Sequence, residues 1–137
     1  MQLEINNLTK FVADKKSFSQ VAKIVLKGEN KEMASLSLAF VNEKEMQKLN
    51  KNFRGKNKPT DVLSFDLQDG NYLGEIVICP KVVKDNAKKY GVLAKKEILK
   101  VFIHGILHLL DYDHEKSEKE AQIMEKKQDL YLLKVFK

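Results

Sequence analysis

The chain has 137 residues, 43% of them hydrophobic, which is enough for one ordinary domain with a core and excludes the disordered class. Its longest uninterrupted apolar runs contain four residues, which excludes a transmembrane helix or a secretory signal. No membrane partner is therefore expected, and the cytoplasm is the expected location. The lone cysteine, Cys79, excludes an intrachain disulfide and a multi-cysteine zinc ribbon. The net charge of +6 is compatible with an anionic partner.

The apolar pattern predicts secondary structure along the whole chain. In chain order it predicts a strand at 2–6, a helix at 17–28, a strand at 35–41, a helix at 42–54, strands at 61–67 and 73–79, and helices at 80–91, 93–110 and 117–133. Two residue pairs resemble capping boxes at helix starts, Ser17 with Gln20 and Asn42 with Glu45. Pro80 suits the first turn of the helix that follows it.

These elements predict a small α+β fold. The turn residues at 69–71 predict a hairpin between the last two strands. A right-handed crossover would make strands 35–41 and 61–67 parallel. Helix 93–110 is apolar over much of its circumference, so it is expected to be central. Because no linker or repeat divides the chain, residues 1–137 are predicted to form a single domain, a mixed sheet of about four strands packed with about five helices.

The three histidines of the chain, His104, His108 and His114, all lie within one eleven-residue window. Residues four apart on a helix lie above one another, so His104 and His108 can bind one ion, with His114 folding back as a third ligand. Three imidazoles are typical of a catalytic zinc site, here on the central helix and with one ion per chain, and nickel or another divalent metal stays open. Asp111 and Asp113 are candidate hydrogen-bond partners of the imidazoles. Simple packing of the histidines is the weaker alternative for three at this spacing.

Gly105 bears on the class of reaction. Zincin proteases carry a glutamate general base immediately after their first histidine, and this chain has a glycine there. The spacing of four and then six residues nonetheless equals that of the metzincin proteases. A metalloprotease-like hydrolase is therefore an alternative whose general base is missing.

The segment 48–58 contains five basic residues and no acid, including Arg54, the only arginine among 25 basic residues. Arginine has a planar fork that binds two phosphate oxygens at once, which lysine cannot do. Beside a metal site, this favours phosphate recognition over a merely solvated loop. Base-stacking aromatic residues are not obviously arrayed, so sequence-specific recognition is not predicted. The candidate phosphate-binding residues are Lys51, Arg54, Lys56 and Lys58.

Three blocks of the sequence, 54–65 (RGKNKPTDVLSF), 73–76 (LGEI) and 104–114 (HGILHLLDYDH), carry a resemblance to a known family. Their content and order resemble YbeY, the family of bacterial endoribonucleases of ribosomal RNA maturation. Asp111 stands where the family usually has glycine, at the turn that leaves the helix. Aspartate tolerates a left-handed conformation there with a small penalty, so the fold-back of the third histidine is still expected.

The resemblance implies a single-strand-specific, metal-dependent endoribonuclease. Its expected roles are maturation of the 3′ end of 16S ribosomal RNA and ribosome quality control, and its expected partners are single-stranded or ribosomal RNA, the small ribosomal subunit and assembly factors. By the same resemblance, His104, His108 and His114 bind the metal, and His114 and Arg54 are catalytic. From the charge of their segment, Lys51, Lys56 and Lys58 are expected to contact RNA together with Arg54.

The expected mechanism places RNA in a groove between segment 48–58 and the metal-binding helix. Arg54 would hold the scissile phosphate and neutralise its charge in the transition state. The attacking group is either metal-activated water or the 2′-OH, and the general base is not identified. Glu75, at a position where the family has aspartate, is a candidate carboxylate or a structural residue. A further alternative is a non-catalytic, metal-containing ribosome-assembly factor, which would not cut single-stranded RNA.

Overall fold

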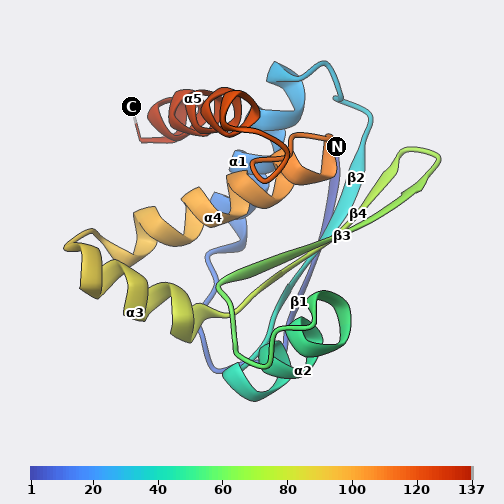
Figure 1. Cartoon of the computed structure of the whole chain (residues 1–137). Helices are drawn as coiled ribbons and strands as arrows, with labels where there is room; N and C mark the ends of the chain where they lie inside the picture. The colour runs from blue at the N-terminus through green and yellow to red at the C-terminus, as the bar shows by residue number, and fades with distance from the viewer. Residues whose placement is uncertain (137) are drawn as a thin grey trace.

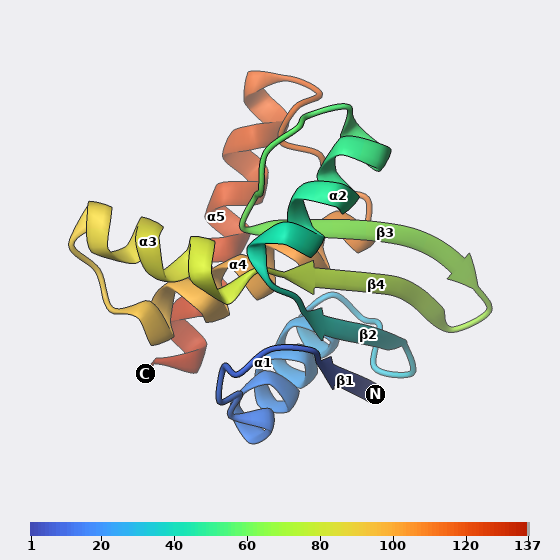
Figure 2. The ribbon, with the colours of Figure 1, turned by 90° about the horizontal axis from the view of Figure 1, so that it is seen from below.

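The computed structural model describes residues 1–136, which form one domain with a four-stranded mixed sheet and five helices, as predicted. The sheet lies between α2 on one face and α1, α4 and α5 on the other (Figures 1 and 2). The elements are β1 (Gln2–Asn7), α1 (Lys15–Gly28), β2 (Ser35–Phe40), α2 (Glu43–Arg54), β3 (Val62–Asp69), β4 (Tyr72–Ile78), α3 (Pro80–Tyr90), α4 (Ala94–Leu109) and α5 (Glu118–Val135). Within residues 1–136, no helix has the length and hydropathy needed to span a bilayer.

The strand order is β1-β2-β4-β3, so β3 is an edge strand. β1 pairs with β2 and β2 with β4 in parallel, while β3 and β4 form the predicted antiparallel hairpin. The prediction that β2 and β3 run parallel is wrong. Phe40, at the end of β2, and Val62, at the start of β3, both pair with Ile78. The chain therefore leaves and re-enters the sheet at the same end, and α2 does not carry it back along the strands.

Helix ends follow from local capping, with one correction. Asp14, not Ser17, caps α1: its Oδ2 accepts a 2.7 Å hydrogen bond from the Ser17 hydroxyl, and the helix begins at Lys15. Asn42 caps α2 as predicted, accepting from the Glu45 backbone N–H at 2.9 Å. Capping therefore settles where these helices begin, and the first of them starts earlier than the Ser17 pattern predicts.

α4 is the central helix and contacts α1, α3, α5, β3 and β4. Gly105 lets its second half approach the sheet, because a Cβ on this residue would lie 2.9 Å from Cγ2 of Ile76 on β4. The Ser64 hydroxyl of β3 also donates a 3.2 Å hydrogen bond to the Gly105 carbonyl. These contacts hold the histidine-bearing part of α4 against the edge of the sheet.

Candidate metal centre

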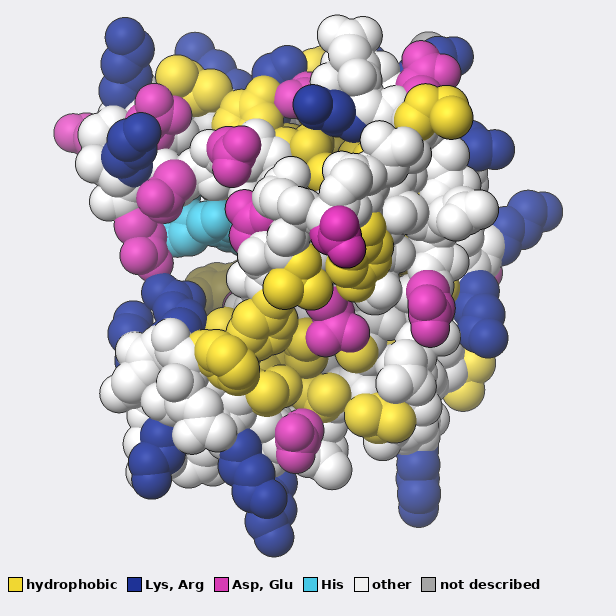
Figure 3. Space-filling view, turned by 90° about the vertical axis from the view of Figure 1, so that its right-hand side faces the viewer, with side chains coloured by type: hydrophobic (Ala, Val, Ile, Leu, Met, Phe, Trp, Pro, Cys, Tyr) yellow, Lys and Arg dark blue, Asp and Glu magenta, His cyan; other side chains and the backbone are white. Residues whose placement is uncertain are grey.

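The histidines open onto the main cavity that we find within residues 1–136, a cleft of about 1070 Å³. Its walls are the end of α2, the edge strand β3, the last turns of α4 and the loop 111–116. In Figure 3 the histidines lie inside a hollow, with acidic side chains along one side and basic side chains along the other. The cleft therefore joins the two segments, 48–58 and 104–114, that carry the predicted chemistry.

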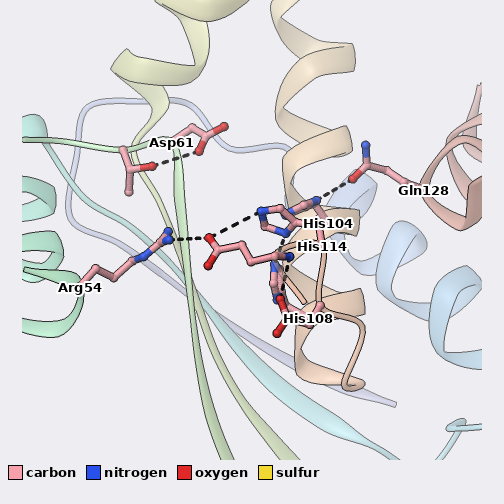
Figure 4. A network of polar contacts seen from close by, with 9 residues as sticks. Arg54, Asp61, His104, His108, His114 and Gln128 are labelled. Carbon is pink, nitrogen blue, oxygen red and sulfur yellow. Dashed lines mark hydrogen bonds and ion pairs between the residues drawn. The ribbon is translucent and has the colours of Figure 1, made fainter. Parts of the chain in front are cut away.

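His104 and His108 lie one turn apart on α4, and His114 folds back from the loop to face them (Figure 4). One nitrogen from each ring lies within 4.8 Å of the others, and His108 Nε2 is 3.0 Å from His114 Nδ1. Two nitrogens on one tetrahedral zinc ion are separated by roughly 3.3 Å. Three nitrogen donors at this spacing fit one divalent metal ion.

The fold-back of His114 depends on the turn that ends α4. Asp111 adopts the left-handed conformation expected at this position, with φ of +74°. The backbone N–H of Asp111 donates to the His108 carbonyl, and that of Tyr112 donates to the Leu107 carbonyl, both at 3.1 Å, which closes the helix in a Schellman-type turn. Aspartate therefore makes the left-handed turn that the sequence analysis expects here.

A cluster of side chains that contact Glu29 anchors the loop 111–116. The Tyr112 hydroxyl donates a 2.6 Å hydrogen bond to Glu29 Oε1, and the Tyr131 hydroxyl and Lys127 ammonium, both from α5, contact Glu29 Oε2. Burial alone raises the pKa of Glu29, but these hydrogen bonds outweigh it, and the net pKa lies below its ordinary value. An ionised carboxylate after α1 thus joins the loop of the third histidine to α5.

Gln128 orients the first histidine. This buried residue of α5 places Oε1 2.9 Å from His104 Nδ1, and because Oε1 only accepts, Nδ1 carries the proton and Nε2 keeps its lone pair for a metal. Gln128 was not predicted from the sequence. The one available signal is a polar residue within the apolar stripe of α5, three residues before Tyr131 and four after Met124.

The protein environment keeps two of the rings neutral. Burial lowers the pKa of His104, although the hydrogen bond to Gln128 acts in the opposite direction. Burial, followed by the charges of the two neighbouring histidines, lowers the pKa of His108 to about 4. Neutral imidazole is the form that binds a metal, so these two rings are already in the required protonation state at neutral pH.

Arg54 reaches the cleft from the end of α2 (Figure 4). There it pairs with Glu115. Its Nη2 donates to Glu115 Oε1 at 2.7 Å, and the same oxygen lies 3.8 Å from His114 Nε2. The pair spans the opening of the cleft between two separate segments. No sequence pattern indicates Glu115, because the pairing depends on a contact between residues 61 positions apart.

The predicted lysines lie near the cleft without lining it. Lys51, Lys56 and Lys58 are exposed on the end of α2 and the loop after it, whereas the unpredicted Lys116 lines the cleft. Asn50 holds the loop by donating a 2.8 Å hydrogen bond to the Lys58 carbonyl. Of these four lysines, therefore, only Lys116 belongs to the lining of the cleft.

The three predicted carboxylates occupy different places. Asp111 and Asp113 line the cleft, but Asp113 accepts from the Glu115 backbone N–H at 2.9 Å. Glu75 lies on β4 opposite Phe65, outside the cleft. Among residues 1–136, the side chain that hydrogen-bonds the His104 imidazole is Gln128 and not one of these carboxylates. Asp111 and Asp113 belong to the turn after α4, and Glu75 lies on β4.

Gly105 has no room for the glutamate of a zincin protease. Its missing Cβ faces the Ile76 side chain at 2.9 Å, so a longer side chain would push α4 away from the sheet. The metal-binding helix thus shares its histidine spacing with the metzincin proteases but not the position of their base.

Comparison with known proteins supports the resemblance found in the sequence. The sequence model described as endoribonuclease YbeY matches residues 4–135. The endoribonuclease YbeY of Bdellovibrio bacteriovorus is 50% identical over 99 residues, which cover 72% of this chain and 65% of that protein. The Thermotoga maritima endoribonuclease YbeY is 44% identical over 101 residues, which cover 74% of this chain and 67% of that protein. The matched part thus spans about two thirds of these relatives.

A solved structure supports the fold. The solution structure of a Thermotoga maritima protein superposes with a TM-score of 0.70 at 36% identity, covering 98% of this chain and 89% of that one. Because the family match extends over nearly the whole chain and includes the segments that build the cleft, the chain belongs to the YbeY endoribonuclease family.

Proposed function

We propose that this chain, over residues 1–137, acts as a single-strand-specific, metal-dependent endoribonuclease domain in the cytoplasm. The observation that carries the proposal is the cluster of three histidines facing Arg54 across one cleft. The donor set suits one divalent ion, zinc or nickel among others, held by His104, His108 and His114. When bound there, such an ion supplies Lewis-acid polarisation of a phosphate oxygen and activation of water.

The residues of the chain would bind and orient the RNA backbone. The Arg54 guanidinium is already held at the cleft by an anionic partner, Glu115, so a phosphate can replace that carboxylate. Once paired with phosphate, Arg54 would also neutralise charge that develops in the transition state. His114, beside this ion pair, is the metal ligand nearest to Arg54's partner and is the second residue we assign to catalysis.

Lysines around the entrance would supply salt-dependent attraction to the RNA. Lys51, Lys56 and Lys58 carry charge to the side of the cleft formed by α2, and Lys116 carries it to the loop of the third histidine. Such contacts act on phosphates and do not distinguish bases. They therefore fit a backbone-binding nuclease whose chemistry is confined to the rings and the guanidinium.

The proposal for the cellular role is supported by the family resemblance and not by the cleft. We infer that the substrate is ribosomal RNA, with maturation of the 16S 3′ end and ribosome quality control as the processes served. The small ribosomal subunit and its assembly factors are the corresponding partners.

Metal content and RNA cleavage, measured on the same preparations, test the proposal. We expect about one metal ion per wild-type chain and little in His108→Ala, because two nitrogens alone bind a catalytic metal weakly. Arg54→Ala should keep the metal and lose cleavage of a single-stranded RNA. Lys95→Ala, which removes one positive charge outside the cleft, is the matched control and should cleave normally.

Two results would contradict the proposal. Equal cleavage by wild type, His108→Ala and Arg54→Ala would indicate a contaminating nuclease. Metal-loaded wild type that cuts neither single-stranded nor duplex RNA would instead favour a non-catalytic assembly factor.

A further inference from the structure

One wall of the cleft is apolar and lies beside Arg54. Phe53 of α2 and Leu67 of β3 are 65% and 60% exposed, and both line the cleft with Phe65. In Figure 3 hydrophobic side chains gather beside the hollow that holds the histidines. Contiguous exposed apolar surface inside a cleft is typical of a binding site and offers little to folding.

The ring of Phe53 is held in place without being buried. It meets the Phe65 ring edge-on, with centroids 4.8 Å apart and planes at 70°. Phe65 is itself anchored, since it packs against the smaller core cluster together with Leu49 and Val82. Phe53 is therefore fixed by the last turn of α2 and by a supported neighbour, while most of its surface stays available to a ligand.

Phe53 and Arg54 together match the two parts of a nucleotide, the base and the phosphate. Arg54, the next residue, also lines the cleft, and consecutive Cα atoms are only about 3.8 Å apart. A guanidinium for phosphate and an aromatic ring for a base thus arise from one helix turn. Exposed aromatic rings bind the faces of unpaired bases and tolerate any base, because every base has a π-face.

We propose that Phe53, supported by Phe65 and flanked by Leu67, is a stacking platform for the nucleobase next to the phosphate held by Arg54. This inference rests on the proposed endoribonuclease function and assigns the base-binding subsite of that cleft. In a duplex, both faces of a base are covered by its neighbours, so such a platform favours single-stranded RNA. It selects strandedness and not sequence.

The test uses a short single-stranded RNA and a set of matching RNAs that each lack one base. Cleavage kinetics and equilibrium binding are measured for wild type, Phe53→Ala and Phe53→Trp. Tyr90→Ala is the matched control, because Tyr90 is 66% exposed and lies outside the cleft. Metal content and thermal unfolding are measured for every variant, so that a folding or metal defect is separated from a binding defect.

Phe53→Ala should raise KM and Kd for the intact RNA about ten-fold, with kcat far less affected, because one stacked base is lost. Phe53→Trp should restore binding, and Tyr90→Ala should match wild type. One abasic position should weaken wild-type binding by a similar factor and should not weaken Phe53→Ala further.

Three outcomes would overturn the platform. The first is that Phe53→Ala binds the intact RNA as tightly as wild type does. The second is that Phe53→Ala loses affinity by the same factor for intact and for abasic RNA. The third is that Phe53→Trp does not restore binding. A wild-type protein that binds the RNA with the expected abasic pattern but never cuts it would instead contradict the proposed nuclease function alone. A protein that neither binds nor cuts would contradict both.

Discussion

The two walls of the cleft are built in different ways. The metal wall is formed by a central helix whose two histidines are partly buried, with one ring fixed by a buried glutamine. The opposite wall is the end of α2, where Phe53 and Arg54 are exposed, and the predicted lysines lie on this side outside the lining. Metal ligands need a fixed geometry, which packing provides, whereas attraction to phosphates acts through solvent and needs only a concentration of charge.

The comparison of the two walls predicts a large loss of zinc affinity when a residue that orients a histidine is changed. Gln128→Ala should lower zinc affinity about 10- to 100-fold, because His104 loses the partner that fixes its tautomer and orientation. A chelator competition titration measures the affinity. Gln122→Ala, an exposed glutamine on the same helix, is the control and should bind zinc normally. Equal affinity in both variants would show that packing alone orients the ring.

The Glu29 cluster should contribute stability that depends on pH. Its folded pKa is lowered, so the contribution is complete above the unfolded value of about 4.5 and is lost as pH falls through the folded value. Glu29→Gln should lower the free energy of unfolding at pH 7 by about 2 kcal/mol relative to wild type. This difference should become smaller in acid. Urea unfolding over a pH series measures this.

Glu4→Gln, at an exposed position of β1, is the control for the Glu29 experiment and should behave like wild type. If the difference in unfolding free energy between Glu29→Gln and wild type stays constant from pH 7 to acid pH, the ionised form of Glu29 does not stabilise the loop. The support of the metal wall would then come from packing of the two tyrosines instead.

The smallest stability effect is expected for the exposed ion pair between Arg54 and Glu115. Glu115→Gln should change the free energy of unfolding by less than about 1 kcal/mol, because the side chains of Arg54 and Glu115 are 38% and 59% exposed. Single-stranded RNA should bind more tightly, since Arg54 is released and a negative charge is removed. Asp85→Asn breaks a similarly exposed pair with Lys81 outside the cleft and is the control.

Loss of several kcal/mol of stability in Glu115→Gln would show that the ion pair is a structural link across the cleft. Weaker RNA binding in Glu115→Gln than in Asp85→Asn would contradict the idea that Glu115 competes with phosphate for Arg54.

Local patterns in the sequence predicted much of the site. The spacing of His104 and His108 follows from helix geometry, and the left-handed turn at Asp111 was expected from the family resemblance. The order of strands and helices was also predicted. These features depend on residues within a few positions of one another, which is the range over which periodicity and capping act.

Contacts between distant segments were not predictable in this way. Gln128 meets His104 across two helices, and Glu115 meets Arg54 across the cleft. The sequence shows no obvious row of aromatic residues for base stacking, yet the fold brings the rings of Phe53 and Phe65 into contact. Each pairing depends on how α2, β3, α4 and α5 are placed relative to one another in the packed fold, which no local pattern encodes.

The sequence alone identifies the scarce and therefore informative residues, three histidines and one arginine, and the helical spacing of His104 and His108. The packed fold was needed to show that β3 lies at the edge of the sheet, antiparallel to β2, and lines the cleft together with the last turns of α4. The physical reason is that helix spacing is set by bonds a few residues apart, whereas a cleft exists only after separate elements have packed.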